Sequence, residues 1–344
     1  MLNTATPIEN KFDELRASQH VLQQAIGYAY QAALRAAVQL NLAEHLANSP
    51  KTAQQLAQET GGSERTLHQI LRLLASRQIF ESLSDSRFGL NSQAQFLLAD
   101  HPFSLRQAVL MLTDQTFWMP LYQLRDTALK QPVFENLFGN TFFEYWEKNA
   151  DLPDNFHNGM SSMSAIENHY IVKHYDFPKN AVVADIAGGF GSLLLEVLKQ
   201  NPSTKGILFD REHVVKNHVL HELGDDPRWT LCPGSFFEKC PEADVFLLKY
   251  ISHDWPDEKV VTILKTIRNA MKDTSRLLLV DCIIDEDDIP YFAKELDLLC
   301  IQFSPDAGGH TKAEFEALFA QAELKLNRII STDSHTSIIE LSIN

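Results

Sequence analysis

The segment Val182–Gly191, with the sequence VVADIAGGFG, restricts the possible fold more than any other part of the chain. Its first residues are apolar apart from Asp185, as expected of a strand that is covered on both faces of a sheet. The glycines that follow allow a sharp turn and a close approach of backbone to a ligand. A helix is predicted to begin near Ser192, with its N-terminal amides directed at that ligand.

The nature of the ligand is restricted by what the turn lacks. A phosphate-binding loop would end in Gly-Lys-Ser/Thr, and a dinucleotide-binding turn would space its glycines as G-x-G-x-x-G; neither pattern is present here. The acid Asp185 would repel phosphate but suits a cationic or zwitterionic ligand, such as the methionine part of S-adenosylmethionine. Asp210, which ends the next apolar run, stands at the spacing at which an acid binds ribose hydroxyls. Taken alone, the glycine cluster is equally compatible with a strand, turn and helix that bind nothing.

Length and composition restrict the partners. The chain has 344 residues, a length that suggests two domains. Its formal net charge of −15 at pH 7 argues against nucleic acid and anionic membranes, because both bind clustered positive charge. The four cysteines show no zinc-ligand spacing, which favours buried free thiols in a reducing compartment. No signal peptide or membrane span is recognisable, so we expect a soluble, cytoplasmic protein without a bound metal.

The N-terminal part has the pattern of a winged helix. Two helices, capped by Thr52 and Ser63, precede two β segments at 79–83 and 87–90 that are predicted to form a hairpin. This pattern is typical of DNA-binding domains, but the acidic chain favours a dimerisation or lid module. Residues 12–47 precede it and carry apolar positions at helical spacing. We expect their alanine stripe to pack closely against a second subunit: Ala25, Ala29, Ala33 and Ala37.

Residues 102–175 are predicted to be helical and are rich in aromatic side chains, most of which we expect in the core. From residue 181 onward, strands and helices alternate, which indicates a doubly wound parallel sheet. The last two β runs have only a turn at 333–335 between them and should form an antiparallel hairpin. The predicted strands are 182–186, 206–210, 229–232, 244–249, 276–284, 326–332 and 337–343, and the predicted helices lie near 190–200, 212–222, 257–272, 291–303 and 311–322.

Further polar residues are predicted at the carboxyl ends of the strands, where open α/β sheets bind their ligands. Lys249 ends one strand, and His253 and Asp254 follow it directly. Histidine is a common general base near neutral pH, and a carboxylate inside a strand, such as Asp281, usually has a partner. A hydrogen bond from the ring of His253 to Asp281 would satisfy both side chains. Alternatively, Asp254 caps the next helix and His253 is an ordinary loop histidine.

Three segments resemble motifs of one family. Lys249–Glu258, KYISHDWPDE, is similar to the Lys-x-x-x-His-Asp-Trp-x-Asp-Glu signature of the plant-type small-molecule O-methyltransferases. This family includes caffeate, flavonoid and hydroxyindole O-methyltransferases, with bacterial relatives that act on polyketides and phenazines. The glycine turn resembles the family's Asp-Val-Gly-Gly-Gly-x-Gly, with Ala187 in place of one glycine. Phe156–Ser164 resembles the family's Phe-x-x-x-Met-x-x-x-Ser segment, and the resemblance extends from about residue 20 to the end of the chain.

The resemblance implies a fold and a division into domains. We expect an α/β, doubly wound, Rossmann-like methyltransferase sheet with a C-terminal antiparallel hairpin, preceded by a mostly helical winged-helix dimerisation domain. The expected parts are a dimerisation domain at 1–100, a helical linker and substrate lid at 101–175, and an S-adenosylmethionine-binding domain at 176–344.

The resemblance also implies a cofactor and roles for individual residues. The cofactor would be S-adenosylmethionine, with S-adenosylhomocysteine as product, and His253 would be the catalytic base with Asp281 beside it. Met160 and Met163 are adaptable side chains that suit contact with an aromatic ring. The expected cofactor-binding residues are Ser164, Asp185, Gly188, Asp210, Ser235, Phe236, Lys249 and Trp255. The expected substrate-binding residues are Phe156, Met160, Met163, Ile301, Gln302 and Asp306.

Two segments depart from the family pattern. Gly234-Ser235-Phe236-Phe237 has a serine where the family has an aspartate that helps to hold the adenosine. Gly308-Gly309-His310-Thr311 is two residues shorter than the family's Gly-Gly-Lys-Glu-Arg-Thr and lacks the glutamate that flanks the catalytic histidine. His310 could occupy part of that space.

The sequence therefore predicts an S-adenosylmethionine-dependent methyltransferase that acts on a hydroxyl of an aromatic small molecule and forms a homodimer. One alternative keeps the fold and changes the chemistry, to methylation of a nitrogen or a carboxylate or to another reaction of the same cofactor. A second alternative is a winged-helix regulator that senses a small ligand, against which the net charge counts.

Overall fold

The computed structural model describes residues 7–149, 152, 156–287, 289, 291–304 and 306–344. The chain divides into two compact units, Met1–Thr113 and Asp114–Asn344. This division does not coincide with the expected boundaries at residues 100 and 175, because residues 101–113 belong to the first unit and the aromatic-rich helices after them belong to the second. Within the described ranges, no helix is long and apolar enough to cross a membrane.

The first unit contains the winged-helix pattern. Thr52 forms a capping box with Gln55 at the start of one helix, Gly61 ends that helix in the left-handed conformation, and the Ser63 hydroxyl accepts from the Thr66 amide at the start of the next. The hairpin is antiparallel, and its second strand also pairs with a short strand before the first of these helices. The elements are α1 (Pro7–Ala25), α2 (Tyr28–Gln39), α3 (Leu42–Leu46), β1 (Lys51–Thr52), α4 (Ala53–Thr60), α5 (Glu64–Ser76), β2 (Glu81–Ser82), β3 (Arg87–Gly89), η1 (Ala94–Leu97) and α6 (Arg106–Leu112).

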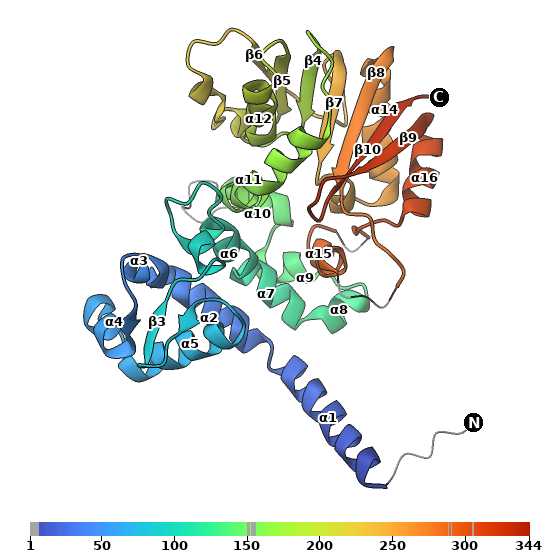
Figure 1. Ribbon diagram of the computed structural model, residues 1–344. Coiled ribbons are helices and arrows are strands. Elements are labelled where there is room, and N and C mark those ends of the chain that lie inside the picture. Colours follow the sequence, from blue (N-terminus) through green and yellow to red (C-terminus); the bar gives the residue numbers. More distant parts are fainter. Residues whose placement is uncertain (1–6, 150–151, 153–155, 288, 290, 305) are drawn as a thin grey trace. The chain divides into compact units, whose positions relative to one another are not determined.

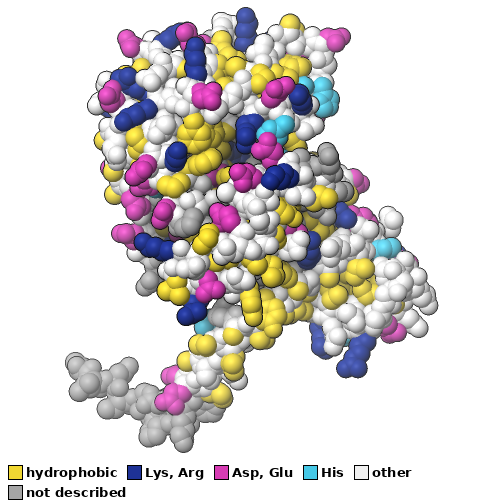
Figure 2. Space-filling view, turned by 180° about the vertical axis from the view of Figure 1, so that it is seen from behind, with side chains coloured by type: hydrophobic (Ala, Val, Ile, Leu, Met, Phe, Trp, Pro, Cys, Tyr) yellow, Lys and Arg dark blue, Asp and Glu magenta, His cyan; other side chains and the backbone are white. Residues whose placement is uncertain are grey.

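The alanine stripe is divided between two environments. Ala33 and Ala37 are buried in the core of the first unit, whereas Ala25 and Ala29 are exposed. The expectation that the whole stripe packs against a second subunit is therefore wrong, because α2 turns its small residues towards α5 and α6 of its own unit. Large apolar side chains are instead exposed along α1 and just after it, as Figure 2 shows for this helix: Leu15, Val21, Leu22, Ile26 and Tyr28.

The second unit is built on a seven-stranded sheet with the order β6-β5-β4-β7-β8-β10-β9 (Figure 1). β4 pairs in parallel with both β5 and β7, so the strand order reverses at β4. β10 is antiparallel to β8 and β9, as expected of a C-terminal hairpin. The strands are β4 (Val182–Ile186), β5 (Lys205–Asp210), β6 (Trp229–Pro233), β7 (Ala243–Lys249), β8 (Met271–Asp281), β9 (Leu324–Ser331) and β10 (Ser337–Ile343).

Helices cover both faces of this sheet because the strands are apolar on both faces. Val183 packs in one core with α11 and α12, whereas its neighbours Ala184 and Ile186 pack in the other core with α14 and α16. The rings of Phe117 and Phe134 lie against Phe142 in the helical segment before the sheet. The helices are α7 (Gln115–Tyr122), α8 (Leu124–Ala128), α9 (Val133–Phe138), α10 (Phe142–Lys148), α11 (Phe156–His174), α12 (Ser192–Gln200), α13 (Glu212–Val215), η2 (Leu220–Leu223), η3 (Ser252–Asp254), α14 (Asp257–Ala270), α15 (Phe292–Cys300) and α16 (Lys312–Gln321).

Two predicted elements differ from the observed ones. The strand predicted at 276–284 is β8, which begins at Met271 and ends at Asp281. Asp281 therefore stands at the carboxyl end of this strand and not within it. The helix predicted at 212–222 is divided into α13 and η2. Between them the Val219 amide donates to the carbonyl of Phe190 in the glycine turn, which draws the backbone out of a regular helix.

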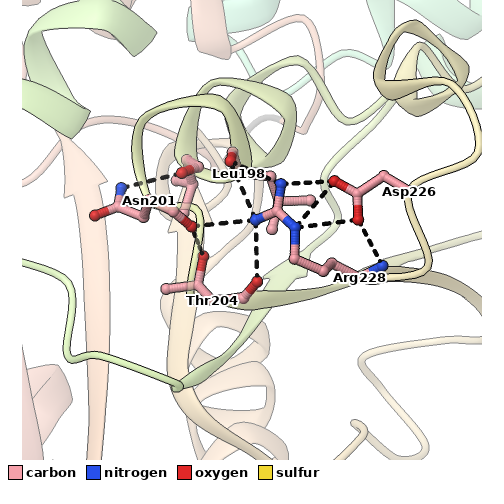
Figure 3. Close-up of polar contacts among 6 residues, drawn as sticks. Leu198, Asn201, Thr204, Asp226 and Arg228 are labelled. Atoms are coloured by element: carbon pink, nitrogen blue, oxygen red, sulfur yellow. Dashed lines mark hydrogen bonds and ion pairs between the residues drawn. The ribbon is translucent and has the colours of Figure 1, made fainter.

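Arg228 fixes the far end of α12, the helix that follows the glycine turn (Figure 3). Its guanidinium donates to the carbonyls of Leu198, Asn201 and Thr204, each at 3.2 Å, and is itself held by Asp226. The last carbonyls of a helix have no partner within the helix, so a buried end requires such a donor. This interaction anchors α12 and, with it, the turn at its N-terminus.

Candidate active site

A cavity of about 860 Å³ lies at the carboxyl ends of β4, β5, β6 and β7. This is the edge at which open α/β sheets bind their ligands, next to the strand where the order reverses. Its wall combines the glycine turn, the ends of these strands, and side chains from α10 and α11. All of the expected cofactor-binding residues border it: Ser164, Asp185, Gly188, Asp210, Ser235, Phe236, Lys249 and Trp255.

The glycine turn is tightly constrained. The backbone φ values of Ala187, Gly189 and Gly191 are 54°, 59° and 83°, in the left-handed region. Residues other than glycine adopt this region at an energetic cost. Gly188 has no room for a side chain, because a Cβ atom there would lie 2.6 Å from Cγ of Asp185 and 2.7 Å from Cδ1 of Leu208. The turn therefore closes directly over the side chain at the end of β4.

Asp185 fits the ammonium group of an amino-acid ligand. The side chain is buried, and among the described residues its Oδ2 atom has no hydrogen-bond partner. Burial raises the pKa of this carboxyl to about 7, while a hydrogen bond from the Leu194 backbone opposes the shift. A cation bound beside Asp185 would supply the missing partner and stabilise the ionised form.

Asp210 fits the ribose of a nucleoside. Its Oδ2 accepts from the Gly189 amide at 2.8 Å, and its Oδ1 accepts from the Arg211 amide at 2.7 Å. Burial raises the pKa of Asp210, and these two amides oppose the shift. The carboxylate is thus fixed at the end of β5, within the cavity, with lone pairs remaining for hydroxyl donors.

Aromatic rings in contact with one another form part of the cavity wall beside these acids. Trp255 lies edge-on to Phe237, with ring centroids 5.0 Å apart, and stacks on Phe143 at 5.8 Å with an interplanar angle of 14°. Ser235, which stands where the family has an aspartate, accepts from the Phe237 amide at 3.3 Å and so stabilises its own turn. This aromatic wall suits a planar base such as adenine, held by apolar contact.

His253 lies in η3, between two carboxylates. Its Nδ1 is 2.8 Å from Oδ1 of Asp281, and its Nε2 is 3.5 Å from Oδ1 of Asp254. Asp281 also accepts from the hydroxyl of Ser252 and from the Cys282 amide. Of the imidazole and its two carboxylates, only Asp254 borders the cavity, whereas His253 and Asp281 lie behind it.

The charges around His253 determine its protonation. Burial by itself would lower the pKa of the imidazole, but Asp281, followed by Asp254 and Asp297, raises the pKa to about 9. Burial raises the pKa of Asp254 to about 7, although the charge of His253 opposes this shift. Burial would raise the pKa of Asp281, but the charge and hydrogen bond of His253, together with the hydrogen bonds from Ser252 and Cys282, lower it below its usual value. At neutral pH the ring therefore carries a proton.

The shortened Gly308–Thr311 segment does not place His310 beside His253. The Nε2 atom of His310 lies 3.1 Å from Oδ1 of Asp257, and its ring packs on Phe315. Asp297 of α15 comes nearer to the role of the missing acid, because it raises the pKa of His253 and accepts from the Gly309 amide at 2.7 Å. No pattern in the sequence distinguishes Asp297 from the other acids of a predicted helix.

The expected substrate-binding residues are divided. Phe156 and Met160 border the cavity, whereas Met163 belongs to a neighbouring cluster with Tyr250 and Cys282. The other three expected residues follow the end of α15 at Cys300 and do not border this cavity, so their assignment stays a prediction. Ile301 and Gln302 line a separate cavity of about 20 Å³ beside α9, and Asp306 is exposed.

Other residues of the cavity were not identified from the sequence. Phe143, Asn168 and Tyr250 border it, and so does His157, whose pKa is lowered to about 4 by burial and by His213. Glu167 lies just outside, with its Oε2 atom 2.9 Å from Nζ of Lys249. The helical spacing of Glu167 and Asn168 in α11 carried no signal that either faces a ligand.

Two family models match the chain. Residues 118–325 match the O-methyltransferase domain, and residues 22–100 match the O-methyltransferase dimerisation domain. The first match covers more than half of the sequence and includes the whole cavity.

Individual relatives agree with these matches. The chain is 31% identical over 334 residues to a phenazine O-methyltransferase of Lysobacter antibioticus, covering 96% of this chain and 98% of that protein. It is 34% identical to a mitomycin biosynthesis 6-O-methyltransferase of Streptomyces lavendulae, covering 86% of each. The structure of CalO1, a methyltransferase of calicheamicin biosynthesis with bound S-adenosylhomocysteine, superposes with a TM-score of 0.87 at 35% identity and covers 96% of this chain and 99% of CalO1. The chain belongs to the O-methyltransferase family, and it is an S-adenosylmethionine-dependent O-methyltransferase.

Proposed function

We propose that the acceptor is a hydroxyl group on an aromatic small molecule of secondary metabolism. The observation that carries this proposal is the line of Asp281, His253 and Asp254, which ends at a cavity walled by aromatic rings. Phe143, Trp146 and Phe156 border the same cavity and suit a planar acceptor. The names of two relatives, a phenazine O-methyltransferase and a mitomycin biosynthesis 6-O-methyltransferase, support an acceptor of this kind.

The residues of the cavity divide into those that hold the cofactor and those that handle the proton. Asp185 would bind the ammonium group of S-adenosylmethionine, Asp210 the ribose, and the aromatic wall around Trp255 the adenine. When bound, the cofactor supplies a methyl group activated by a sulfonium. Fixing both reactants in one cavity converts an encounter in solution into a reaction within a complex, which accounts for much of the expected rate.

His253 is the base in this proposal. The neutral imidazole accepts the proton of the acceptor hydroxyl, and Asp281, hydrogen-bonded to Nδ1, directs Nε2 towards the cavity and stabilises the imidazolium that forms. Asp254 stands between Nε2 and the cavity, so it contacts the hydroxyl and guides the proton to the ring.

A screen with S-adenosylmethionine and a panel of phenols, hydroxyphenazines, hydroxynaphthoquinones and hydroxyindoles tests the acceptor class. Methyl transfer to oxygen, identified by mass analysis of the product, is the expected result. Transfer to a ring nitrogen or a carboxylate, with no reaction at any hydroxyl, would contradict the proposal.

The role of His253 has its own test. A positioned general base contributes about 10²- to 10⁴-fold to the rate, so His253→Ala should lower turnover by that order for weakly acidic hydroxyls. The loss should be small for a hydroxyquinone that is already ionised at neutral pH. S-adenosylhomocysteine should bind the variant as it binds the wild type. A small loss with every acceptor would mean that positioning alone carries the reaction.

The first unit carries the proposed dimer contact. Residues 22–100 match a dimerisation domain, and the apolar side chains exposed on and after α1 are the surface that a second copy of this unit would cover. The homodimer is therefore proposed to form through α1, in place of the alanine stripe expected from the sequence.

A further inference from the structure

Glu167 is a buried acid that contacts two consecutive residues at the end of β7. The side chain is 5% exposed and belongs to α11. Its Oε1 accepts from the Tyr250 hydroxyl at 2.7 Å, and its Oε2 lies 2.9 Å from Nζ of Lys249. One carboxylate thus holds the side chains of two consecutive residues, and these also contact each other, with Nζ of Lys249 4.8 Å from the centroid of the Tyr250 ring.

Lys249 borders the part of the cavity that we propose binds the cofactor. Its ammonium group also donates to Oδ1 of Asn168 at 3.1 Å. The amide nitrogen of Asn168 donates in turn to the hydroxyl of Ser192 at 3.1 Å, at the first residue of α12. All three residues border the cavity together with the glycine turn. A shift of Glu167 would therefore be transmitted to the wall around Asp185.

Tyr250 leads to His253. It follows β7 directly and adopts a φ of 56°, a conformation that is strained for a bulky side chain. Its amide donates to the carbonyl of Val280, the residue before Asp281, and its ring centroid lies 5.4 Å from that of His253. The hydrogen bond from its hydroxyl to Glu167 restrains the ring of Tyr250 beside His253.

The arrangement is costly, because a carboxylate and an ammonium group are both removed from water and a tyrosine is held in the left-handed region. Packing does not require it, since apolar residues of similar volume can replace a buried ion pair without loss of stability. Strained and buried charged groups collect at functional sites, and this one joins the two halves of the cavity.

We infer that Glu167 is a positioning residue that couples the cofactor side of the cavity to the base: through Lys249 it sets the wall that S-adenosylmethionine contacts, and through Tyr250 it sets the position of His253. The second half of this inference rests on the proposed function of His253. The first half does not, because it concerns cofactor binding alone.

Calorimetry with S-adenosylhomocysteine tests the first half without any acceptor. Glu167→Gln keeps the shape of the side chain and an acceptor for the Tyr250 hydroxyl, but it removes the negative charge that faces the ammonium group of Lys249. We expect affinity for S-adenosylhomocysteine to fall about tenfold, because the Lys249 ammonium loses its buried counter-charge and shifts the wall that the cofactor contacts. Tyr250→Phe, which removes only one hydroxyl, should bind S-adenosylhomocysteine as the wild type does.

Steady-state kinetics test the second half, with the hydroxyphenazine or hydroxynaphthoquinone that the wild type methylates best. Tyr250→Phe should lower kcat about tenfold without changing KM for S-adenosylmethionine, because a misplaced base affects only the reacting complex. Glu167→Gln should raise this KM and also lower kcat. Tyr250→Phe therefore separates the two effects that Glu167→Gln combines.

Glu340 provides a matched control for a purely structural effect. It is also a buried glutamate in an ion pair, with Arg328 at 2.8 Å, but it lies in β10 and does not border the cavity. Glu340→Gln should lower the melting temperature and leave S-adenosylhomocysteine affinity and kcat unchanged. If Glu167→Gln behaves in the same way, the inference is overturned.

A double variant covers the case in which Glu167→Gln does not fold. Glu167→Gln with Lys249→Met removes both charges, which restores a neutral interior. It should bind S-adenosylhomocysteine no better than Lys249→Met alone, and wild-type affinity would overturn the inference. Should the wild type bind S-adenosylhomocysteine and methylate no hydroxyl, the proposed acceptor class would fail while the calorimetric result still decides the role of Glu167.

Discussion

Oδ1 of Asp254 lies 3.5 Å from Nε2 of His253, and of these two residues Asp254 alone borders the cavity. The imidazole is thus enclosed between Asp254 and Asp281, and the acids around it hold its proton more tightly than water would. The base that we propose is consequently strong but already protonated at neutral pH, and several predictions depend on that combination.

The acceptor kcat/KM should rise with pH towards a plateau above about 9. A base must be neutral to accept a proton, and the surrounding carboxylates raise the pKa of His253 to about 9. Below this pKa the neutral fraction, and with it the rate, falls tenfold for each pH unit. The profile should be measured with an acceptor whose hydroxyl does not ionise in the same range. A profile with no change between pH 7 and 10, roughly the range over which such a base would titrate, would show that the histidine is not the base.

Asp297→Asn should shift this rise to lower pH. Asp297 is one of the acids that raise the pKa of His253, so removal of its charge lowers that pKa and increases the neutral fraction at a given pH. The asparagine oxygen can still accept from the Gly309 amide, which limits structural change. Asp306→Asn, at an exposed acid, is the control and should leave the profile in place. Equal profiles for the wild type and Asp297→Asn would exclude Asp297 from this role.

Ala187→Gly should stabilise the protein by about 0.5–1 kcal/mol. The left-handed conformation costs an alanine about 1–2 kcal/mol, and the greater freedom of glycine in the unfolded chain offsets part of the gain. Ala187 has a φ of 54°, whereas Ala184 lies within β4. Denaturant unfolding should therefore show opposite signs for Ala187→Gly and Ala184→Gly. A loss of stability in both variants would mean that the turn is not strained at Ala187.

Asp210→Ala should weaken S-adenosylhomocysteine binding by about 1.5–3 kcal/mol, the value of hydrogen bonds to a charged group. The same change removes the acceptor for the Gly189 and Arg211 amides, so thermal unfolding should accompany the calorimetry. Asp210→Asn keeps one acceptor oxygen and should show a smaller loss. An unaltered dissociation constant for Asp210→Ala would give the acid a role other than binding ribose.

Val21→Glu with Leu22→Glu should convert the proposed homodimer into monomers. Both side chains are more than 60% exposed on α1, at 67% and 65%, and their burial against a second copy would oppose any added charge. Gln23→Glu with Gln24→Glu adds the same two charges at polar, exposed positions of the same helix and should remain dimeric. Sedimentation at micromolar concentration distinguishes the species, and a wild type that is already monomeric would contradict the proposal.

Most local structure could be predicted because its causes lie within a few residues. Thr52 and Ser63 begin helices by accepting from amides three residues later, and Gly61 ends one in a conformation that favours glycine. The turn at 333–335 joins two β runs into the observed hairpin. Helix 212–222 was misjudged because the Val219 amide bonds to Phe190, a partner that lies far away in the sequence.

That the residues expected to bind the cofactor would border one cavity was also predictable. Parallel strands bring their carboxyl ends to one edge, so acids that follow apolar runs, such as Asp185 and Asp210, come together whatever the remaining chain does. The positions of the residues expected to bind the acceptor were less predictable. Ile301 and Gln302 follow a helix whose end directs them to another cavity, and the burial of Ala33 and Ala37 depends on how α2 packs on α5 and α6.

The sequence by itself determined the succession of strands and helices along the second unit, the helix caps, the glycine turn and the identity of the acids at the strand ends. It could do so because backbone conformation and apolar periodicity are local properties. Only the tertiary structure decided the electrostatics of the site. The pKa of His253 depends on Asp254, Asp281 and Asp297, which come from three different elements. Glu167 contacts Lys249 and Tyr250 from a helix far earlier in the chain, 83 residues before the tyrosine. Coulomb interactions and desolvation act through space, so their strength is set when the chain folds and the water between these groups is removed.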